Sequence, residues 1–413
     1  MLTRRVFLQS GGLALFSLGV EPRFLDRLAL AADGVGRPKV LVTIFLRGAM
    51  DGLMAVPLLS EEPALSRLRP RLAMSATGSE NPVIDLEGRF GLHPAFEPLL
   101  PFFREGRLAI VHAVGSPNPT RSHFDAQDYM ETGTPWRKGT ESGWLNRVAS
   151  QLPGSMSTFG AVSLSADLPR SLYGDIPALA IDNLGDFKLS AFANKAGAPI
   201  DEHLQVLYQR GASGSLQRNA KEMFEATRLL SQDELSAYQA QNGKAYPPSA
   251  LGKSLLQIAY LIKAGVGLRI ASAESQGWDT HVNQGAGSGY FARKAGDLAQ
   301  SIAAFWKDIG PYQDDVVVLT MTEFGRTVRE NGSGGTDHGH GSCLFVLGNS
   351  IDGGRIYGDL PSIEPEALFE GRDLPVTTDF RSVFSEVTGR LFDIADDRRI
   401  FPGWEGSRLP LFW

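Results

Sequence analysis

Residues 40–46 read Val-Leu-Val-Thr-Ile-Phe-Leu, and this stretch decides the class of fold. It is almost continuously apolar and lacks the alternation expected of a strand with one solvated face. Similar runs occupy residues 108–114, 268–271, 316–321 and 343–347. Such runs are typical of strands buried on both faces of a mostly parallel sheet.

Amphipathic helical patterns separate these apolar runs. Leu251, Leu255 and Ile258 share one helical face, and Ile302 and Phe305 share another. Strands that alternate with such helices predict a doubly wound α/β fold. Residues 190–250 are richer in polar helical stretches and in Gly, Ser and Gln, and they predict a helical insertion into a single domain over residues 32–413.

The N-terminus has the pattern of an export signal. Arg4 and Arg5 precede an apolar run that reaches Val20 and is too short to span a bilayer. Ala-Leu-Ala at residues 29–31 suits a signal peptidase. We therefore expect residues 1–31 to be a twin-arginine signal peptide, the Tat translocase to be a partner during export, and the mature chain to be periplasmic or extracellular. An uncleaved amphipathic anchor is the alternative.

The charge balance limits the class of binding partner, and the cysteine content limits the role of the thiol. Residues 1–31 carry four of the 40 basic and two of the 46 acidic residues, so 36 basic and 44 acidic residues remain, a net charge of −8. This balance argues against nucleic acid or anionic lipid as a partner, and no later segment resembles a membrane span. Cys343 is the one cysteine and lies in an apolar run, which favours a buried small residue over a reactive thiol.

In open α/β sheets, ligands bind beyond the carboxyl ends of the strands. The run at 40–46 is followed by Asp51-Gly52, which by itself also marks an ordinary turn. The run at 108–114 is followed by Ser122, which could cap the next helix or act as a nucleophile supported by the helix dipole and Arg121. Both readings of Ser122 stay open.

The later strands are followed by residues that suit a metal ion. Asp279 and His281 follow the strand that begins at Leu268, and their oxygen and imidazole ligands suit zinc, manganese or iron. A histidine bonded to its own turn is the alternative. Further candidates follow the run at 316–321 or the glycine-rich loop at 332–336, namely Glu323, Asp337, His338 and His340. Three of the seven histidines thus lie in such loops, which predicts metal binding.

These segments resemble the bacterial family called domain of unknown function 1501. The matching motifs are residues 46–52, 121–124, 277–281, 323–327 and 335–339, and they extend over nearly all of the chain after residue 31. Members typically carry twin-arginine signals. The family is grouped by fold with the alkaline phosphatase, sulfatase and cofactor-independent phosphoglycerate mutase superfamily, so the resemblance implies an alkaline phosphatase-like α/β/α sandwich.

The wider superfamily uses two divalent metals and a nucleophile at a helix N-terminus. By resemblance, Asp51 corresponds to the acid after the first strand and Ser122 to the nucleophile. Asp279 and His281 look like the acid and histidine of one metal site, and His338 or His340 resembles the distal histidine.

One position departs from the superfamily pattern. Glu323 falls where an Asp-His pair normally follows a strand, and Phe324 occupies the place of the histidine. One metal site is therefore short of a ligand, unless His123, Asp337 or the second histidine of the 338–340 pair compensates.

The resemblance implies an exported metal-dependent hydrolase of phosphate or sulfate esters that uses one or two divalent metals, zinc, manganese or similar. A metal at Asp279, His281 and His338 would polarise an ester oxygen while Ser122 attacks. Arg47, Arg121 or Arg326 would hold the anionic group of a small or polymer-linked ester. The alternative is a non-catalytic exported binding or scaffold protein that keeps the fold and a structural metal. A nucleophile-elbow serine hydrolase is excluded, because no strand-to-helix turn carries Gly-x-Ser-x-Gly.

Overall fold

The computed structural model describes residues 36–77, 81–184, 238, 240, 245–360 and 362–413. The chain divides into two compact units, Met1–Pro38 and Lys39–Trp413, and everything below concerns the second. The predicted signal peptide and nearly all of the predicted helical insertion lie outside the described residues. Within the described ranges, no helix is both long enough and apolar enough to cross a membrane.

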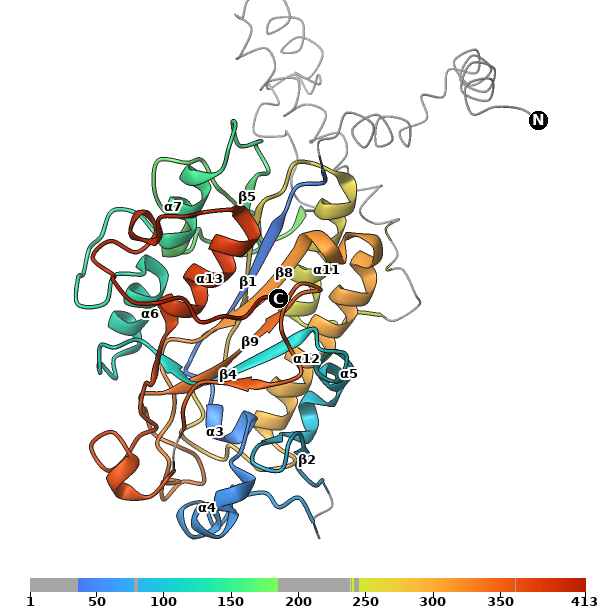
Figure 1. Ribbon diagram of the computed structural model, residues 1–413. Coiled ribbons are helices and arrows are strands. Elements are labelled where there is room, and N and C mark those ends of the chain that lie inside the picture. Colours follow the sequence, from blue (N-terminus) through green and yellow to red (C-terminus); the bar gives the residue numbers. More distant parts are fainter. Residues whose placement is uncertain (1–35, 78–80, 185–237, 239, 241–244, 361) are drawn as a thin grey trace, which may run out of the picture. The chain divides into compact units, whose positions relative to one another are not determined.

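A nine-stranded sheet, counted over the described residues, forms the centre of the second unit (Figure 1). Its order is β10-β4-β9-β8-β1-β7-β5-β6, with β11 also beside β4. The strands are β1 (Val40–Leu46), β4 (Leu108–Gly115), β5 (Ala161–Ser163), β6 (Leu179–Ala180), β7 (Ile270–Ser275), β8 (Val316–Met321), β9 (Ser342–Leu347), β10 (Ile356–Tyr357) and β11 (Thr378–Asp379). A separate antiparallel pair is formed by β2 (Ile84–Asp85) and β3 (Gly91–Leu92).

Strand direction brings the functional loops to one edge of the sheet. β1 is parallel to both of its neighbours, with Leu41 opposite Ile270 of β7 and Val317 of β8. β9 is antiparallel to β8 and to β4. β9 therefore begins at the edge where β1, β4, β7 and β8 end, and the loops that leave those strands meet the loop that enters β9.

The predicted strands correspond closely to the observed ones. β1 and β8 have the predicted boundaries, and β7 lies two residues later than the run that begins at Leu268. The mostly parallel α/β sheet is confirmed. Cys343 lies on β9 and is 1% exposed, and burial raises the pKa of its thiol, as suits a small core residue.

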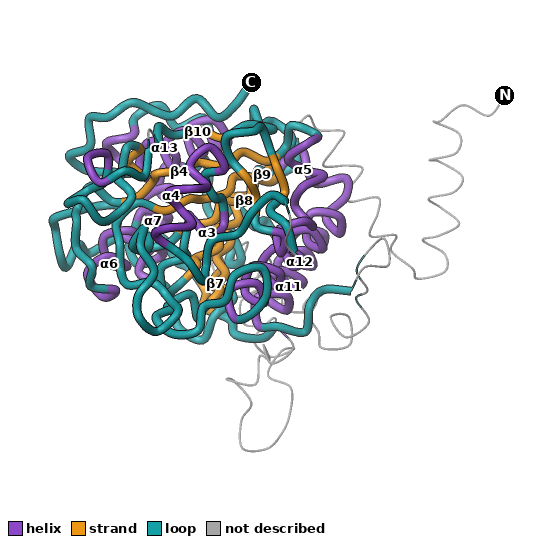
Figure 2. Tube along the Cα trace, turned by 90° about the horizontal axis from the view of Figure 1, so that it is seen from below, coloured by secondary structure: helices purple, strands orange, loops and turns teal. Residues whose placement is uncertain are grey.

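Helices cover both faces of the sheet, and Figure 2 shows the strands between two helical layers. One face packs against α5 (Leu100–Arg104), α11 (Ala250–Ala264) and α12 (Tyr290–Ile309), and the other against α6 (His123–Thr132), α7 (Trp144–Gln151) and α13 (Phe380–Phe392). On β1, Val42 and Ile44 join the first core, whereas Leu41 and Phe45 join the second. The continuous apolar run is thus explained by burial on both faces.

Short helices lie in the connections. They are α3 (Gly52–Ala55), α4 (Glu62–Leu68), η1 (Leu59–Glu61), η2 (Pro94–Leu99), η3 (Arg170–Leu172), η7 (Gly310–Asp315), η8 (Pro365–Ala367) and η9 (Asp397–Arg399). The helix α6 matters most for the site. It begins at His123, directly after the extended Ser122, and ends before Gly133, whose φ of 66° is the left-handed conformation that glycine adopts without strain.

The central position of β8 gives a test of the core. We expect Leu319→Ala to lower the free energy of unfolding by about 2–5 kcal/mol, because Leu319 is fully buried and its truncation leaves a cavity. Urea titration followed by circular dichroism measures this loss. Gln300→Ala on the exposed side of α12 is the control and should change stability by less than about 0.5 kcal/mol. Equal stability of the two variants would contradict the two-sided burial of β8.

Candidate metal centre

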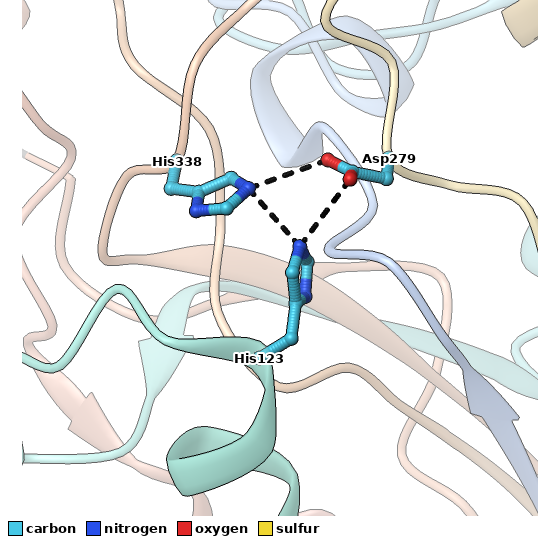
Figure 3. A group of neighbouring side chains, drawn as sticks. All are labelled: His123, Asp279 and His338. Atoms are coloured by element: carbon cyan, nitrogen blue, oxygen red, sulfur yellow. Dashed lines mark hydrogen bonds and ion pairs between the residues drawn. The ribbon is translucent and has the colours of Figure 1, made fainter.

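Three histidines and one aspartate converge beyond the carboxyl ends of the parallel strands. His123 begins α6, Asp279 and His281 follow β7, and His338 precedes β9. His338 Nε2 lies 3.0 Å from His123 Nε2 and 2.9 Å from His281 Nε2. The Asp279 carboxylate lies 3.1 Å from His281 Nε2, 3.3 Å from His338 Nε2 and 3.5 Å from His123 Nε2. Figure 3 shows His123, His338 and Asp279 pointing toward one another.

The second ring nitrogen of each histidine faces a group that only accepts hydrogen bonds. These contacts are His123 Nδ1 to Glu323 Oε1 at 2.8 Å, His281 Nδ1 to Asp337 Oδ1 at 3.0 Å, and His338 Nδ1 to the carbonyl of Arg121 at 2.8 Å. Each Nδ1 therefore carries the hydrogen, and a neutral ring then has its lone pair on Nε2. The lone pairs of His123 and His338 and the Asp279 carboxylate lie within mutual reach, and His281 Nε2 contacts this group through His338 and Asp279.

This donor set fits a divalent transition metal. Imidazole nitrogen and carboxylate oxygen are the ligands that zinc, manganese and iron accept. Metal–ligand bonds of about 2.1 Å in a tetrahedron place the donor atoms about 3.4 Å apart, close to the observed separations. Histidines bonded through their other nitrogen to carboxylate or carbonyl groups are typical of metal ligands.

A proton on a histidine Nε2 atom competes with a metal ion for the same lone pair. The hydrogen bond to Glu323 is the largest cause that raises the pKa of His123, which favours a proton on this ring. Burial is the largest cause that lowers the pKa of His338, which keeps that ring neutral and able to accept. A protonated His123 can then donate from Nε2 to His338, and a metal must displace that proton.

Glu323 supports His123 instead of joining the inner ligands. Its side chain is fully buried, and Oε1 accepts from His123 Nδ1, from the backbone N–H of Gly48 at 2.8 Å and from Gln127 Nε2 at 2.9 Å. Burial opposes ionisation of Glu323, but these hydrogen bonds outweigh it and its pKa is lowered. Glu323 is predicted among the ligands from its position after β8. The structure gives it an orienting contact.

Asp337 orients His281 as Glu323 orients His123, because Asp337 Oδ1 accepts from His281 Nδ1. Its Oδ1 also accepts from Asn331 Nδ2 at 3.0 Å, and this bond is the largest cause that lowers the pKa of Asp337. Sequence reasoning missed both Asn331 and Gln127. Gln127 could have been found, because it lies four residues after His123 and hence on the same face of α6. Asn331 carries no comparable signal.

Arg326 ties together the loops that carry the centre. The guanidinium is buried and donates to the carbonyls of Gly48, Ala49, Trp278 and Thr336 and to Asp279 Oδ1, over distances of 2.5–3.0 Å. Burial opposes ionisation of Asp279, but Arg326 outweighs it and the pKa of Asp279 is lowered. Arg326 therefore positions Asp279 and has little freedom to bind a substrate.

Gly48 permits the close approach of these loops. Its φ is 109°, and a Cβ at this position would lie 2.6 Å from the backbone nitrogen of Asp279. Any side chain here would push the Asp279 loop away from the first loop of the sheet.

The other two arginines predicted to bind an anion are also engaged. Arg47 donates to Glu131 at 2.6 Å and to Glu274 at 2.5 Å. Arg121 donates to Asp373 and Glu370, both at 2.6 Å. Each guanidinium is thus paired with two carboxylates of the protein itself, and the expectation that these arginines hold the anionic group stays a prediction.

Asp51 lies apart from the centre. It is 1% exposed, and its two oxygens accept from Met54 N at 3.1 Å, from Arg69 at 2.8 and 3.1 Å, and from Gln284 Nε2 at 2.7 Å. With these partners Asp51 caps α3 and forms a buried ion pair. Its expected place among the metal ligands is corrected to a structural one.

His340 is likewise separate from the other two predicted histidines. Its Nε2 donates to the carbonyl of Ser116 at 2.9 Å, and its ring centroid lies 4.6 Å from that of Phe369. Burial lowers its pKa and keeps the ring neutral. Of the 338–340 pair, the structure brings only His338 to the inner cluster. His123, one of the residues that could compensate for the ligand missing at Phe324, contacts His338 in the inner cluster.

Phe324 closes the inner side of the centre. It is 2% exposed and packs with Ala49 and Ala126, and its ring centroid lies 4.9 Å from that of His123 and 5.1 Å from that of His338. Across the described ranges, one group of three or more metal-ligating side chains within mutual reach is found, His123, Asp279 and His338.

Ser122 lies next to the centre, at the N-cap of α6. Its backbone is extended, its side chain is exposed, and its hydroxyl makes no capping hydrogen bond to the helix. The capping interpretation therefore holds for its position in the chain but not for its hydroxyl.

The contact between Glu323 and His123 gives a test. We expect Glu323→Gln to weaken metal binding by about 10- to 100-fold, because the amide no longer fixes the His123 ring through a charged acceptor. Competition with a chromophoric chelator measures the affinity. Asp125→Asn on the same helix, where Asp125 pairs with Lys138, is the control and should bind metal like the unmodified chain. Equal affinity of both variants would remove Glu323 from the centre.

Comparison with solved structures finds remote similarities. A protein of the alkaline phosphatase superfamily from Vibrio parahaemolyticus is 12% identical over 79% of this chain, with a TM-score of 0.33, and this chain spans 63% of its length. The lipoteichoic acid synthase LtaP from Listeria monocytogenes is 10% identical over 80% of this chain and 69% of its own, with a TM-score of 0.30. Alkaline phosphatase from the Antarctic bacterium TAB5 is 10% identical over 76% of this chain and 93% of its own, with a TM-score of 0.29.

A comparison with curated proteins finds no match. A family described as "Protein of unknown function (DUF1501)" matches residues 109–402. This match covers most of the chain and includes all four residues of the centre, His123, Asp279, His281 and His338. The protein therefore belongs to the DUF1501 family, as its motifs predict.

Proposed function

We propose that the protein is a metal-dependent hydrolase of phosphate or sulfate esters. The observation that carries this proposal is the convergence of three Nε2 lone pairs and the Asp279 carboxylate, with every outer nitrogen held by an acceptor. A purely structural cluster of neutral histidines would leave these lone pairs facing one another, which is unfavourable in a partly buried site.

The inner ligands proposed for the metal are His123, Asp279, His281 and His338. A bound divalent ion would act as a Lewis acid toward an ester oxygen. Ser122 supplies the nucleophile in this proposal, since its exposed hydroxyl directly precedes His123 and is not used by the helix. Its oxygen would form the new bond to phosphorus or sulfur as the bond to the ester oxygen breaks, with the serine proton passing to the departing alcohol oxygen. Water would then cleave the seryl ester and release phosphate or sulfate, restoring the serine hydroxyl.

A second candidate function is favoured by Phe324. Its buried ring fills the side of the centre where a further histidine would be needed for a second metal. A protein with one metal and no catalysis, which binds or scaffolds an exported partner, is consistent with that arrangement. The number of bound metals and the effect of replacing Ser122 on ester hydrolysis distinguish the two candidate functions.

The cellular setting is also proposed. The arginine pair and short apolar run support export of the folded chain by the Tat translocase to the periplasm or beyond. The family resemblance supports a small or polymer-linked anionic ester as the substrate, and the net charge of −8 after residue 31 argues against nucleic acid.

Metal content gives the first test. Elemental analysis of purified protein should find about one equivalent of zinc, manganese or iron per chain, and a chelator should remove the metal together with ester hydrolysis. His281→Ala should lower the content, because it removes one of four ligands. A protein that binds no divalent metal, even after anaerobic preparation without chelators, would overturn both candidate functions.

The second test concerns Ser122. Ser122→Ala should lower the rate of p-nitrophenyl phosphate or sulfate hydrolysis by at least about 100-fold, because the nucleophile is lost, while the metal content stays unchanged. Ser150→Ala, which removes an exposed serine hydroxyl on α7, is the control and should keep most of the activity. Hydrolysis that survives in Ser122→Ala would assign the attack to another group.

The third test is the pH dependence of metal binding. The raised pKa of His123 means that this ring is protonated below that pKa, and a metal must then displace one proton. Affinity should therefore fall about tenfold per pH unit as the pH drops below the pKa of His123, and should level off above it. Calorimetry in buffers of different ionisation enthalpy measures the released proton. An affinity that does not change between pH 5 and 8 would contradict histidine ligation.

A further inference from the structure

A cleft of about 550 Å³ adjoins the metal centre. Two residues connect it to the histidines. Asp337 lines the cleft and holds His281, and Arg372 lines the cleft and donates to the carbonyl of His338 at 2.7 Å. The cleft is therefore placed to hold a part of a molecule whose other end reaches the centre.

The cations of the cleft are less neutralised than its anions. Its lining includes Arg67, Arg329 and Arg372. Within the described residues, the Arg329 guanidinium has no hydrogen bond or ion pair, and its side chain is exposed. Arg372 donates one hydrogen bond to a neutral carbonyl, and its nearest carboxylate, that of Asp373, lies at 3.6 Å.

The acids of the cleft already have partners. Glu330 accepts from the Arg71 side chain at 2.7 Å and from the backbone N–H groups of Arg71 and Leu72. Asp337 is bound by His281 and Asn331. Glu364 lies 3.7 Å from Arg67, and both side chains are more than half exposed, so this pair is weak. Counted with Arg71, which pairs with Glu330, four arginines stand against the three acids Glu330, Asp337 and Glu364, which leaves the cleft with one positive charge.

An apolar wall lies beside these arginines. It consists of Leu68, Val328, Ile363 and Leu368. Val328 and Ile363 are at most 1% exposed and belong to the main core, and the half-buried Leu68 and Leu368 pack against that core and present the apolar surface to the cleft. Guanidinium groups next to a fixed apolar surface suit an organic anion with a short hydrocarbon segment.

We propose that this cleft binds the non-reacting part of the substrate, an organic anion with an apolar segment, and that Arg329, Arg372 and Arg67 hold the anionic group. This assignment rests on the proposed hydrolase function. It adds arginines that have fewer ion pairs than Arg47, Arg121 and Arg326, whose guanidinium groups are bound by carboxylates of the protein itself. The substrate class is then an ester that carries a second anionic group, separated from the reacting ester by a hydrocarbon segment.

Binding of hexyl phosphate to the full chain tests the proposal, measured by calorimetry with and without a chelator. The unmodified protein should bind hexyl phosphate in both conditions, more tightly than inorganic phosphate and more tightly than hexanol. Arg329→Ser combined with Arg67→Ser should weaken binding at least tenfold. Arg398→Ser, which alters an exposed arginine outside the cleft lining, should bind like the unmodified protein.

The outcomes separate the cleft from the catalytic proposal. Binding that persists in chelator and is lost in the double variant supports the cleft, whether or not any ester is hydrolysed. Binding that vanishes in chelator, or that survives in the double variant, overturns the cleft and leaves the metal centre untouched. Equal affinity for hexanol also overturns it, because the arginines would then contribute nothing.

Discussion

The buried guanidinium of Arg326 is the interaction on which the arrangement of the centre depends. It collects acceptors from the loop after β1, the loop after β7 and the segment before His338, which are far apart in the sequence. A buried charge is tolerated only where it is paired and fully hydrogen-bonded, and here Asp279 and four carbonyls meet that requirement. The same bonds that satisfy Arg326 therefore fix the position of Asp279 relative to the histidines.

The centre divides its polar groups into two layers with different tasks. The inner layer presents lone pairs and a carboxylate, and the outer layer of Glu323, Asp337 and the Arg121 carbonyl sets the orientation of each ring. Gln127 and Asn331 in turn fix the two outer carboxylates. Such layering keeps ligand rings from rotating and lowers the conformational entropy lost when a ligand binds.

Much of this arrangement could be predicted from the sequence. The features that could not be predicted depend on how distant segments are arranged in the tertiary fold. β1 and β8 were predictable because continuous apolar runs of that length fit two-sided burial. Asp279, His281 and His338 were predictable because they directly follow or precede such runs. The antiparallel direction of β9 was not, since an apolar run carries no direction. The partners of Asp51, Arg47 and Arg121 were not predictable either, because Arg69, Glu274 and Asp373 reach them only through the tertiary fold.

The distance along the chain between the proposed ligands has a consequence for how a metal ion would be chosen. His123 and His338 are 215 residues apart, so an unfolded chain offers no site and the ligands meet only after the sheet has formed. A nitrogen-rich site binds copper and zinc more tightly than manganese or iron whatever its shape, so geometry alone does not decide which ion is kept. If the chain crosses the membrane already folded, the metal supply of the cytoplasm, and not that of the destination, determines which ion the protein carries.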